Sequence, residues 1–201
     1  MVKVLFDFLI SFIALILLLP VLILIAIISI VLQGFPVFFL HERLGKDGIV
    51  FTMLKFRTMI NGPSQSAEHD ITRLTGWGRF LRRTSIDELP VLFNVIKGDM
   101  SLVGPRPLPV KYLTRFSDLQ KKRMDIKPGI TGLAQVNGRN HLSWEDRFSY
   151  DVEYIKKKSF FLDLGIIFKT LYIVLFRKNI DSKSQEIMPE FMGTSLHEDE
   201  K

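Results

Sequence analysis

Cysteine is absent from all 201 residues of the chain. This absence excludes disulfide bonds, thiolate metal sites and cysteine nucleophiles, but it does not identify the cellular compartment. Charge is also missing from one long stretch, because no charged residue occurs between Phe8 and Leu32. Neither a P-loop pattern nor a dinucleotide-binding glycine fingerprint is present.

The overall composition predicts a folded domain with an anionic partner. Hydrophobic residues make up 47% of the chain and charged residues 24%, which is typical of a protein with a core rather than a disordered one. The formal net charge is +6, with a pI near 9.5. Such a charge favours nucleic acid, anionic lipid headgroups or a phosphorylated substrate, and it does not choose among them.

The charge-free stretch predicts a membrane segment. As a helix of about 1.5 Å per residue it would be roughly 37 Å long, which exceeds a hydrocarbon core of about 30 Å. A cleaved signal peptide would have a shorter apolar core, so we expect the segment to remain attached. Pro20 predicts a kink, because it removes the hydrogen bond to the Ile16 carbonyl. Two geometries remain, a spanning helix or a re-entrant hairpin whose arms return to one face of the membrane.

A small β-hairpin is predicted after the membrane segment. Strands are expected at 37–40 and 49–59, joined through Gly45–Gly48, whose Asp-Gly pair is a turn signal. Alternation along the second strand places Lys55 and Arg57 on one face with Phe51 and Met53. These two cations are either solvated strand residues or one wall of a phosphate pocket.

The adjacent carboxylates Asp87 and Glu88 are the main candidates for chemistry. Such a pair can supply a nucleophile, a base or a metal ligand. A structural explanation is also available, because Ser85 and Glu88 fit a capping box at the start of a helix that reaches about Lys97. Capping and catalysis are compatible, since the positive end of a helix favours an ionised carboxylate.

Several further segments carry cations or glycines. The arginines 79, 82 and 83 have helical spacing, after an expected loop at 61–78. Arg106 lies in a rigid, proline-rich loop. The glycine-rich stretch 127–132 leads to Gln135 and Arg139 and is either a phosphate or nucleoside cradle or a plain turn.

Near the C-terminus we expect one helix over 148–177, either in the core or at a membrane interface. The last twenty residues are acidic and serine-containing, and they predict a tail with little core.

Four segments together resemble the bacterial sugar transferase family, the monotopic phosphoglycosyl transferases. The segments are Lys55–Met59, Asp87–Pro90, Gly98–Pro107 and Pro128–Arg139. They stand in the family's order behind an N-terminal membrane segment, and the resemblance covers nearly the whole chain. Within the family, the chain is most similar to the small enzymes that consist of the core domain alone.

The resemblance implies an activity and roles for individual residues. A phosphosugar would move from a UDP-sugar to polyprenyl phosphate, such as undecaprenyl phosphate, with Mg²⁺ as cofactor and UMP as product. Asp87 would be the nucleophile and a metal ligand, and Glu88 its partner carboxylate. The substrate-binding candidates are Lys55, Arg57, Arg82, Arg106, Gln135 and Arg139.

The resemblance also implies an architecture. The fold class is α+β, mainly helical with a small β-hairpin, in a monotopic membrane protein with a re-entrant N-terminal helix and interfacial amphipathic helices. The expected parts are a membrane helix at 1–36, a catalytic domain at 37–185 and a tail at 186–201, on the cytoplasmic face of the bacterial inner membrane. Leu19 departs from the polar residue common in the family before the proline, which leaves the bend dependent on Pro20 and on packing.

Two other classes of function compete with the enzyme. A membrane-tethered nucleic-acid-binding module would use the basic excess, but no recognised motif is present and few aromatic residues lie among the arginines. We therefore expect no nucleic acid partner. A noncatalytic membrane scaffold would use Asp87 and Glu88 only as a helix cap. The sugar and the oligomeric state are not predicted.

Overall fold

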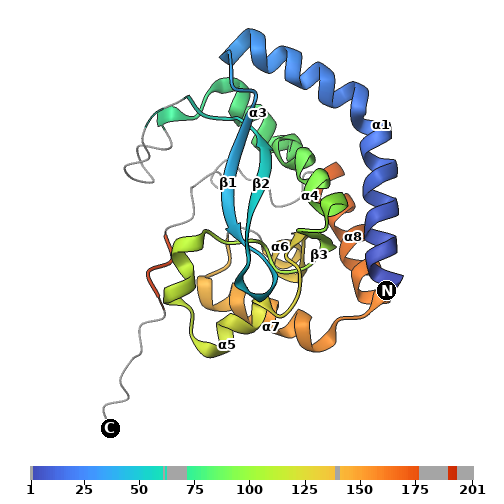
Figure 1. Ribbon diagram of the computed structural model, residues 1–201, viewed down its shortest axis with the longest axis vertical. Coiled ribbons are helices and arrows are strands. Elements are labelled where there is room, and N and C mark those ends of the chain that lie inside the picture. Colours follow the sequence, from blue (N-terminus) through green and yellow to red (C-terminus); the bar gives the residue numbers. More distant parts are fainter. Residues whose placement is uncertain (1, 61, 63–71, 139–140, 177–189, 194–201) are drawn as a thin grey trace.

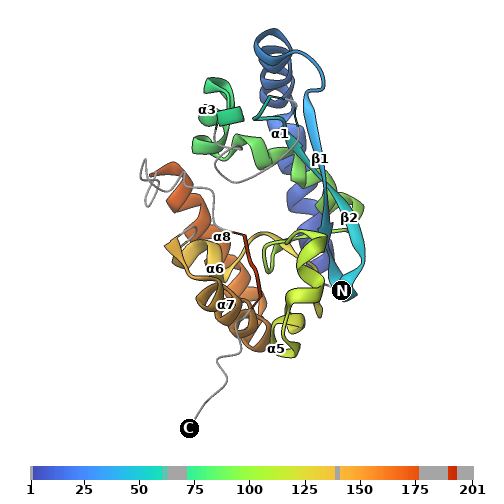
Figure 2. The same cartoon turned by 90° about the vertical axis from the view of Figure 1, so that its left-hand side faces the viewer.

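The fold is mainly helical with a small antiparallel hairpin, as predicted. The computed structural model describes residues 2–60, 62, 72–138, 141–176 and 190–193. The main elements are α1 (Val2–Gln33), β1 (Phe38–Leu44), β2 (Val50–Phe56), α3 (Gly76–Thr84), α4 (Leu92–Lys97), β3 (Ser101–Val103), α5 (Asp118–Lys121), β4 (Gly129–Thr131), α6 (Leu133–Asn137), α7 (Trp144–Lys157) and α8 (Phe160–Leu175). Figure 2 shows the hairpin and α1 along one side and α6, α7 and α8 along the other.

Helix α1 is a single bent helix rather than two arms joined by a turn. It runs without interruption from Val2 to Gln33 with Pro20 inside it, and Figure 1 shows the bend near its middle. One stripe at helical spacing is buried: Asp7, Ser11, Leu15, Leu22, Ile25 and Ser29. Most of its other apolar side chains are exposed, and α1 is the only described helix long and apolar enough to cross a membrane.

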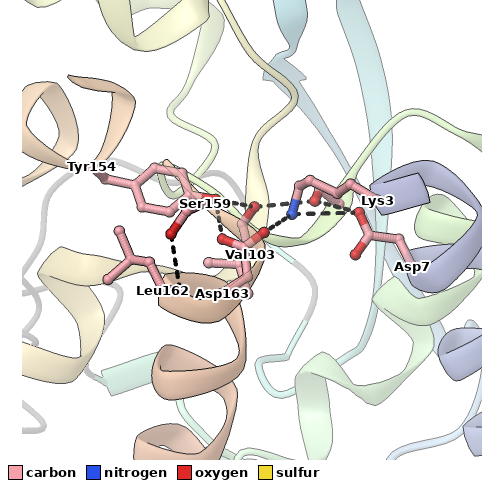
Figure 3. Close-up of polar contacts among 8 residues, drawn as sticks. Lys3, Asp7, Val103, Tyr154, Ser159, Leu162 and Asp163 are labelled. Carbon is pink, nitrogen blue, oxygen red and sulfur yellow. Dashed lines mark hydrogen bonds and ion pairs between the residues drawn. The ribbon is translucent and has the colours of Figure 1, made fainter. Parts of the chain in front are cut away.

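The N-terminal end of α1 is held against β3 and α8 by a partly buried cluster of polar side chains (Figure 3). The ammonium of Lys3 lies 2.5 Å from the carboxylate of Asp163 in α8. The Tyr154 hydroxyl of α7 donates to the same carboxylate at 2.6 Å, and the Ser101 hydroxyl of β3 donates to Asp7 at 2.6 Å. The start of α1 therefore contacts α8 and β3 through charged or polar groups, and α7 joins the same cluster through Asp163.

The C-terminal end of α1 is also fastened, through Arg57 and Trp77. One Arg57 nitrogen donates to the carbonyl oxygens of Gln33 at 2.5 Å and Gly34 at 2.6 Å. The indole N–H of Trp77 in α3 donates to Ser29 at 2.9 Å. Both ends of α1 are thus held by one folded unit.

The hairpin is confirmed, but its strands are shifted relative to the prediction. β1 extends to Leu44 and β2 ends at Phe56, with Asp47 at a positive φ of 55° in the connecting turn. The antiparallel register pairs His41 with Met53 and Arg43 with Phe51. The polar sequence at 41–43 concealed the extension of β1, because pairing with β2 overrides local polarity.

A short parallel pair, β3 with β4, was not predicted, and it explains the glycine-rich stretch. The amide of Gly129 donates to the Pro105 carbonyl at 2.9 Å, and the amide of Gly104 donates to Thr131 at 2.9 Å. A Cβ on Gly129 would lie 2.1 Å from the Gly104 nitrogen, and one on Gly132 would lie 2.2 Å from the Gly104 oxygen. These glycines therefore allow two backbones to touch, which favours the structural interpretation of the stretch.

The prediction of one helix over 148–177 was wrong. The chain leaves helical geometry at Lys158, and Ser159 caps α8 by accepting a hydrogen bond from the Leu162 amide at 3.2 Å. Helix α8 then exposes a row of large apolar side chains, including Phe161 at 83% and Leu175 at 74%.

The expected tail also contains one core residue, although only residues 190–193 of it are described. Phe191 is 1% exposed and packs against Tyr112, Phe116 and Phe148. The prediction of a tail with little core is therefore wrong at this position.

Candidate active site

The dyad, Asp87 and Glu88, lies in a short 3₁₀ turn that connects α3 to α4. The turn covers Ile86–Val91, and Ser85 just before it has a positive φ of 58° that ends α3. Ser85 makes no capping hydrogen bond with its side chain. The predicted capping box is therefore wrong, because the Glu88 side chain has other partners.

Glu88 is paired with two cations that come from distant segments. The Lys55 ammonium of β2 lies 2.6 Å from Glu88 Oε1. The Arg106 guanidinium donates to Oε1 at 2.5 Å and to Oε2 at 3.3 Å. Burial alone would raise the pKa of Glu88, but Arg106 and Lys55 hold it well below its usual range. Glu88 is thus an ionised carboxylate whose two oxygens are both engaged.

Asp87 is in the opposite situation, although it is the next residue. It is 8% exposed, and within the described ranges no salt bridge reaches its carboxylate. Burial and then the charge of Glu88 raise the pKa of Asp87 to about 6, with smaller opposing effects from Lys55, Arg82 and Arg106. Asp87 is therefore a desolvated carboxylate, and two of the three cations that affect its pKa, Lys55 and Arg106, form ion pairs with Glu88. This is a typical environment for a reactive carboxylate.

Of the six predicted substrate-binding residues, three lie near the dyad and a fourth lies at the contact with α1. Lys55 and Arg106 meet at Glu88, and Arg82 is close enough to lower the pKa of Asp87 while its Nε donates to the Thr58 hydroxyl at 3.0 Å. Arg57 instead binds the C-terminal end of α1, through the carbonyl oxygens of Gln33 and Gly34. Its predicted place on the Lys55 face is wrong, because β2 ends at Phe56 and alternation does not continue.

The other two candidates receive no support from the geometry. Gln135 lies in α6, and both polar atoms of its amide are buried without a hydrogen-bond partner in the part of the chain that is described. Its described neighbour is the glycine crossing around Gly132, not the dyad. Arg139 lies outside the described residues, so its predicted role stays a prediction.

Sequence reasoning missed two residues that share the face of the hairpin with Lys55. In the observed register, His41 and Arg43 of β1 lie opposite Met53 and Phe51. Met53 and Phe51 lie two and four residues before Lys55, so all three are on the same face of β2. Arg43 is near Arg106 and Glu88, since both affect its pKa. Extending the period-two pattern of β1 from Leu40 to Leu44 would have identified them.

Comparison with known proteins gives the class of this site. The family model described as bacterial sugar transferase matches residues 1–177. An uncharacterized sugar transferase of Bacillus subtilis is 48% identical over 163 residues, which are 80% of this chain and 81% of the relative. The chain belongs to the bacterial sugar transferase family.

Longer relatives carry more specific names. An undecaprenyl-phosphate galactose phosphotransferase of Salmonella typhimurium is 42% identical over 72% of this chain, which corresponds to 34% of the relative. A UDP-glucose:undecaprenyl-phosphate glucose-1-phosphate transferase of Xanthomonas campestris is 42% identical over 88% of this chain and 39% of the relative. The transferase therefore spans little more than a third of the length of these two proteins.

The donor set of the transferase limits the kind of metal site it can form. Across residues 2–60, 72–138 and 141–176, no group of three or more His, Cys, Asp or Glu residues lies together as a metal site. Glu88 has both oxygens engaged, so Asp87 is the carboxylate of the dyad with oxygens left for a cation. Mg²⁺ commonly uses one or two carboxylates together with substrate phosphates and water. The site fits that arrangement and does not fit an all-protein cage.

Proposed function

We propose that the transferase moves a phosphosugar from a UDP-sugar to polyprenyl phosphate and releases UMP. The observation that carries this proposal is the contrast within the dyad, where Glu88 is fully ion-paired and Asp87 is a desolvated carboxylate beside it. The names of the relatives support the substrate class, since one acts on undecaprenyl phosphate with galactose and another combines UDP-glucose with undecaprenyl phosphate.

The proposed reaction has two displacements at phosphorus. A carboxylate oxygen of Asp87 attacks the phosphate that bears the sugar, and the P–O bond to UMP breaks, so that UMP leaves with the electron pair. The product is a covalent acyl phosphate between Asp87 and the phosphosugar. A phosphate oxygen of the lipid then attacks the same phosphorus, the bond to Asp87 breaks, and polyprenyl diphosphate sugar is formed.

The cations around the dyad have complementary roles in this proposal. Lys55 and Arg106 neutralise Glu88, so that the second carboxylate does not repel an incoming diphosphate. Arg106 is the more exposed of the pair, with 34% of its side chain accessible against 15% for Lys55, so it is the better placed to bind a phosphate oxygen as well. Arg82 is close enough to lower the pKa of Asp87, so it is a further cation that can bind phosphate.

A divalent cation is the implied cofactor. Mg²⁺, when bound, would reduce the repulsion between the carboxylate and the phosphates of the substrate. Asp87 would hold it together with phosphate oxygens of the donor. A bound cation would also favour the ionised form of Asp87, which burial disfavours.

The proposed setting is the cytoplasmic face of the inner membrane, with α1 as a re-entrant helix. Two observations support it: the ends of α1 are fastened to the same folded unit, and the side chains between them that face away from it are apolar. A spanning helix would require one end to leave that unit. The exposed apolar row of α8 supports an interfacial position for this helix.

The experiment that tests the activity measures UMP release from detergent-solubilised protein. Wild type and Asp87→Asn are incubated with a panel of UDP-sugars, polyprenyl phosphate and Mg²⁺. UMP is expected from wild type with at least one donor, and at least about 1,000-fold more slowly from the variant. No UMP from folded wild type with any donor, while a control transferase is active, would favour the noncatalytic scaffold.

A further inference from the structure

Arg43 is a cation of the site that the proposed reaction has not used. It lies in β1 opposite Phe51, on the face of the hairpin that also carries Lys55. Arg106 and Glu88 are both close enough to affect its pKa, so Arg43 belongs to the same electrostatic cluster as the dyad. The backbone around it is held by pairing with β2 and by a bridge to Pro109.

The guanidinium of Arg43 has fewer hydrogen-bond partners than a largely buried guanidinium usually has. One Nη2–H donates to His41 Nδ1 at 3.0 Å. The Nε atom is buried and has no hydrogen-bond partner among the described residues. Within the same residues, no carboxylate lies within ion-pair distance of Arg43, because Glu88 is engaged by Lys55 and Arg106. A buried donor on a cation without a counter-charge is costly unless a ligand supplies an acceptor.

The contact with His41 gives Arg43 a fixed orientation. Burial, followed by the charges of Arg43, Lys55 and Lys111, lowers the pKa of His41 to about 4. The imidazole is therefore neutral near pH 7 and accepts the hydrogen bond at Nδ1, which places its own proton on Nε2. A neutral acceptor orients the guanidinium without neutralising it, whereas a carboxylate would do both.

The cluster around the dyad also has an excess of positive charge, which favours the binding of an anion. Burial and then the charge of Arg106 lower the pKa of Arg43 to about 10, so Arg43 remains protonated at neutral pH. Lys55, Arg106 and Arg43 together carry three positive charges around the single charge of Glu88, and Asp87 adds one more when it is ionised. A purely structural arginine near the turn of the hairpin would be expected to pair with a carboxylate.

We infer that Arg43 binds a phosphate oxygen of a substrate, and that His41 is the residue that positions it. This inference rests on the proposed transferase function. The shared chemistry is a phosphate oxygen, which either the diphosphate of the nucleotide donor or the phosphate of the lipid acceptor can supply. A planar guanidinium suits either of them.

The test compares steady-state UMP release by Arg43→Gln, Arg43→Lys and His41→Gln. The UDP-sugar that wild type uses is varied at saturating polyprenyl phosphate, and the lipid is then varied at saturating donor. Lys46→Gln is the matched control, because it removes a cation from the turn of the same hairpin, where half of its side chain is exposed. The melting temperature of each variant is recorded with the nucleotide analogue UDP and without it.

Arg43→Gln is expected to raise one KM by about 10- to 100-fold, as the loss of a charge-assisted hydrogen bond would do, with a smaller change in kcat. A raised KM for the UDP-sugar assigns Arg43 to the nucleotide, and a raised KM for the lipid assigns it to the acceptor. Arg43→Lys should fall between wild type and Arg43→Gln. Lys46→Gln should match wild type.

His41→Gln should raise the same KM by less, and it should add nothing in the Arg43→Gln background, because His41 acts through Arg43. Both KM values within twofold of wild type in Arg43→Gln, or in Arg43→Lys if Arg43→Gln does not fold, would overturn the inference. Absence of UMP from wild type would instead count against the proposed function, so the two failures are distinguishable.

Discussion

Asp87 and Glu88 are consecutive carboxylates in a single 3₁₀ turn, and their side chains meet different surroundings. Glu88 turns toward Lys55 and Arg106, whereas Asp87 is buried without such a partner in the described structure. The electrostatic consequence is a lowered pKa for Glu88 and a pKa of about 6 for Asp87. The dyad can thus keep one permanent anion that orders the cations and one carboxylate available for bond formation.

Asparagine at position 87 is predicted to stabilise the protein at neutral pH. The raised pKa of Asp87 means that folding is favoured by its protonated form, so this contribution is complete below pH 3.8 and is lost as the pH rises through about 6. Asp87→Asn avoids the loss and should gain roughly 1–3 kcal/mol above pH 6. The measurement is the melting temperature of both proteins from pH 4.5 to pH 8 in metal-free buffer.

Glu88→Gln is the matched comparison for that experiment. It leaves Lys55 and Arg106 without their counter-charge and should lower stability by roughly 2–4 kcal/mol at neutral pH. If Asp87→Asn lowered the melting temperature at pH 8 as much as Glu88→Gln does, the assignment of different roles to the two carboxylates would be wrong.

These residue roles could be predicted only in part from the sequence. The dyad and the nearby cations Lys55, Arg82 and Arg106 were identified, whereas Arg43 was missed. The family resemblance was confirmed by the comparisons. The pairing of Glu88 could not be predicted, because its partners lie 33 and 18 positions away in the chain. The capping box at Ser85 failed for the same reason, since a tertiary ion pair of Glu88 outweighs a local hydrogen bond.

At the scale of elements, the position of Arg106 in the site depends on the close contact between the short strands β3 and β4. The loop that carries Arg106 follows β3, and the glycine contacts between β3 and β4 fix where it leaves the pair. Gly104 and Gly129 approach so closely that no side chain fits between them. The position of Arg106 therefore depends on Gly104 and Gly129, two residues without a side chain.

Alanine at position 129 is predicted to destabilise the protein strongly. Its Cβ would lie 2.1 Å from the Gly104 nitrogen, so the two backbones would have to separate. Gly165→Ala is the control, because a Cβ there meets nothing within 4 Å in helix α8 and should stabilise that helix by about 0.5–1 kcal/mol. Thermal unfolding should give a lower melting temperature for Gly129→Ala and an equal or higher one for Gly165→Ala. The reverse order would contradict the packing described here.

The sequence predicted elements best where their local signals are strong. The Asp-Gly turn indicated the hairpin, and the charge-free run indicated α1. β3 and β4 are three residues each, which is too short for a periodic pattern. The break between α7 and α8 has only Ser159 as a signal, and the continuing apolar pattern concealed it.

On the scale of the whole molecule, α1 lies along the folded unit and is held at both ends. The Lys3 and Asp7 contacts hold its start, and the Arg57 and Trp77 contacts hold its end. Between these points, the exposed side chains of α1 and the exposed row of α8 are apolar. In the proposed setting, this arrangement would keep both ends of α1 and the dyad on the same face of the membrane.

Single-cysteine labelling is predicted to detect both ends of α1 on the same side. The chain has no cysteine of its own, so Val2→Cys and Phe35→Cys would each carry one thiol, and both positions are exposed. A membrane-impermeant maleimide should leave both unlabelled in intact cells and label both after the inner membrane is opened. Lys46→Cys, in the hairpin turn, provides the reference for the side on which the folded unit lies. Labelling of Val2→Cys alone in intact cells would indicate a spanning helix.

The most direct measurement is the intact mass of the protein after incubation with its UDP-sugar and Mg²⁺ in the absence of lipid. Attack by Asp87 predicts a mass increase of one phosphosugar on wild type, its disappearance when polyprenyl phosphate is added, and no increase on Asp87→Asn. Turnover without any adduct, or an adduct that persists in Asp87→Asn, would contradict the central claim that Asp87 is the nucleophile.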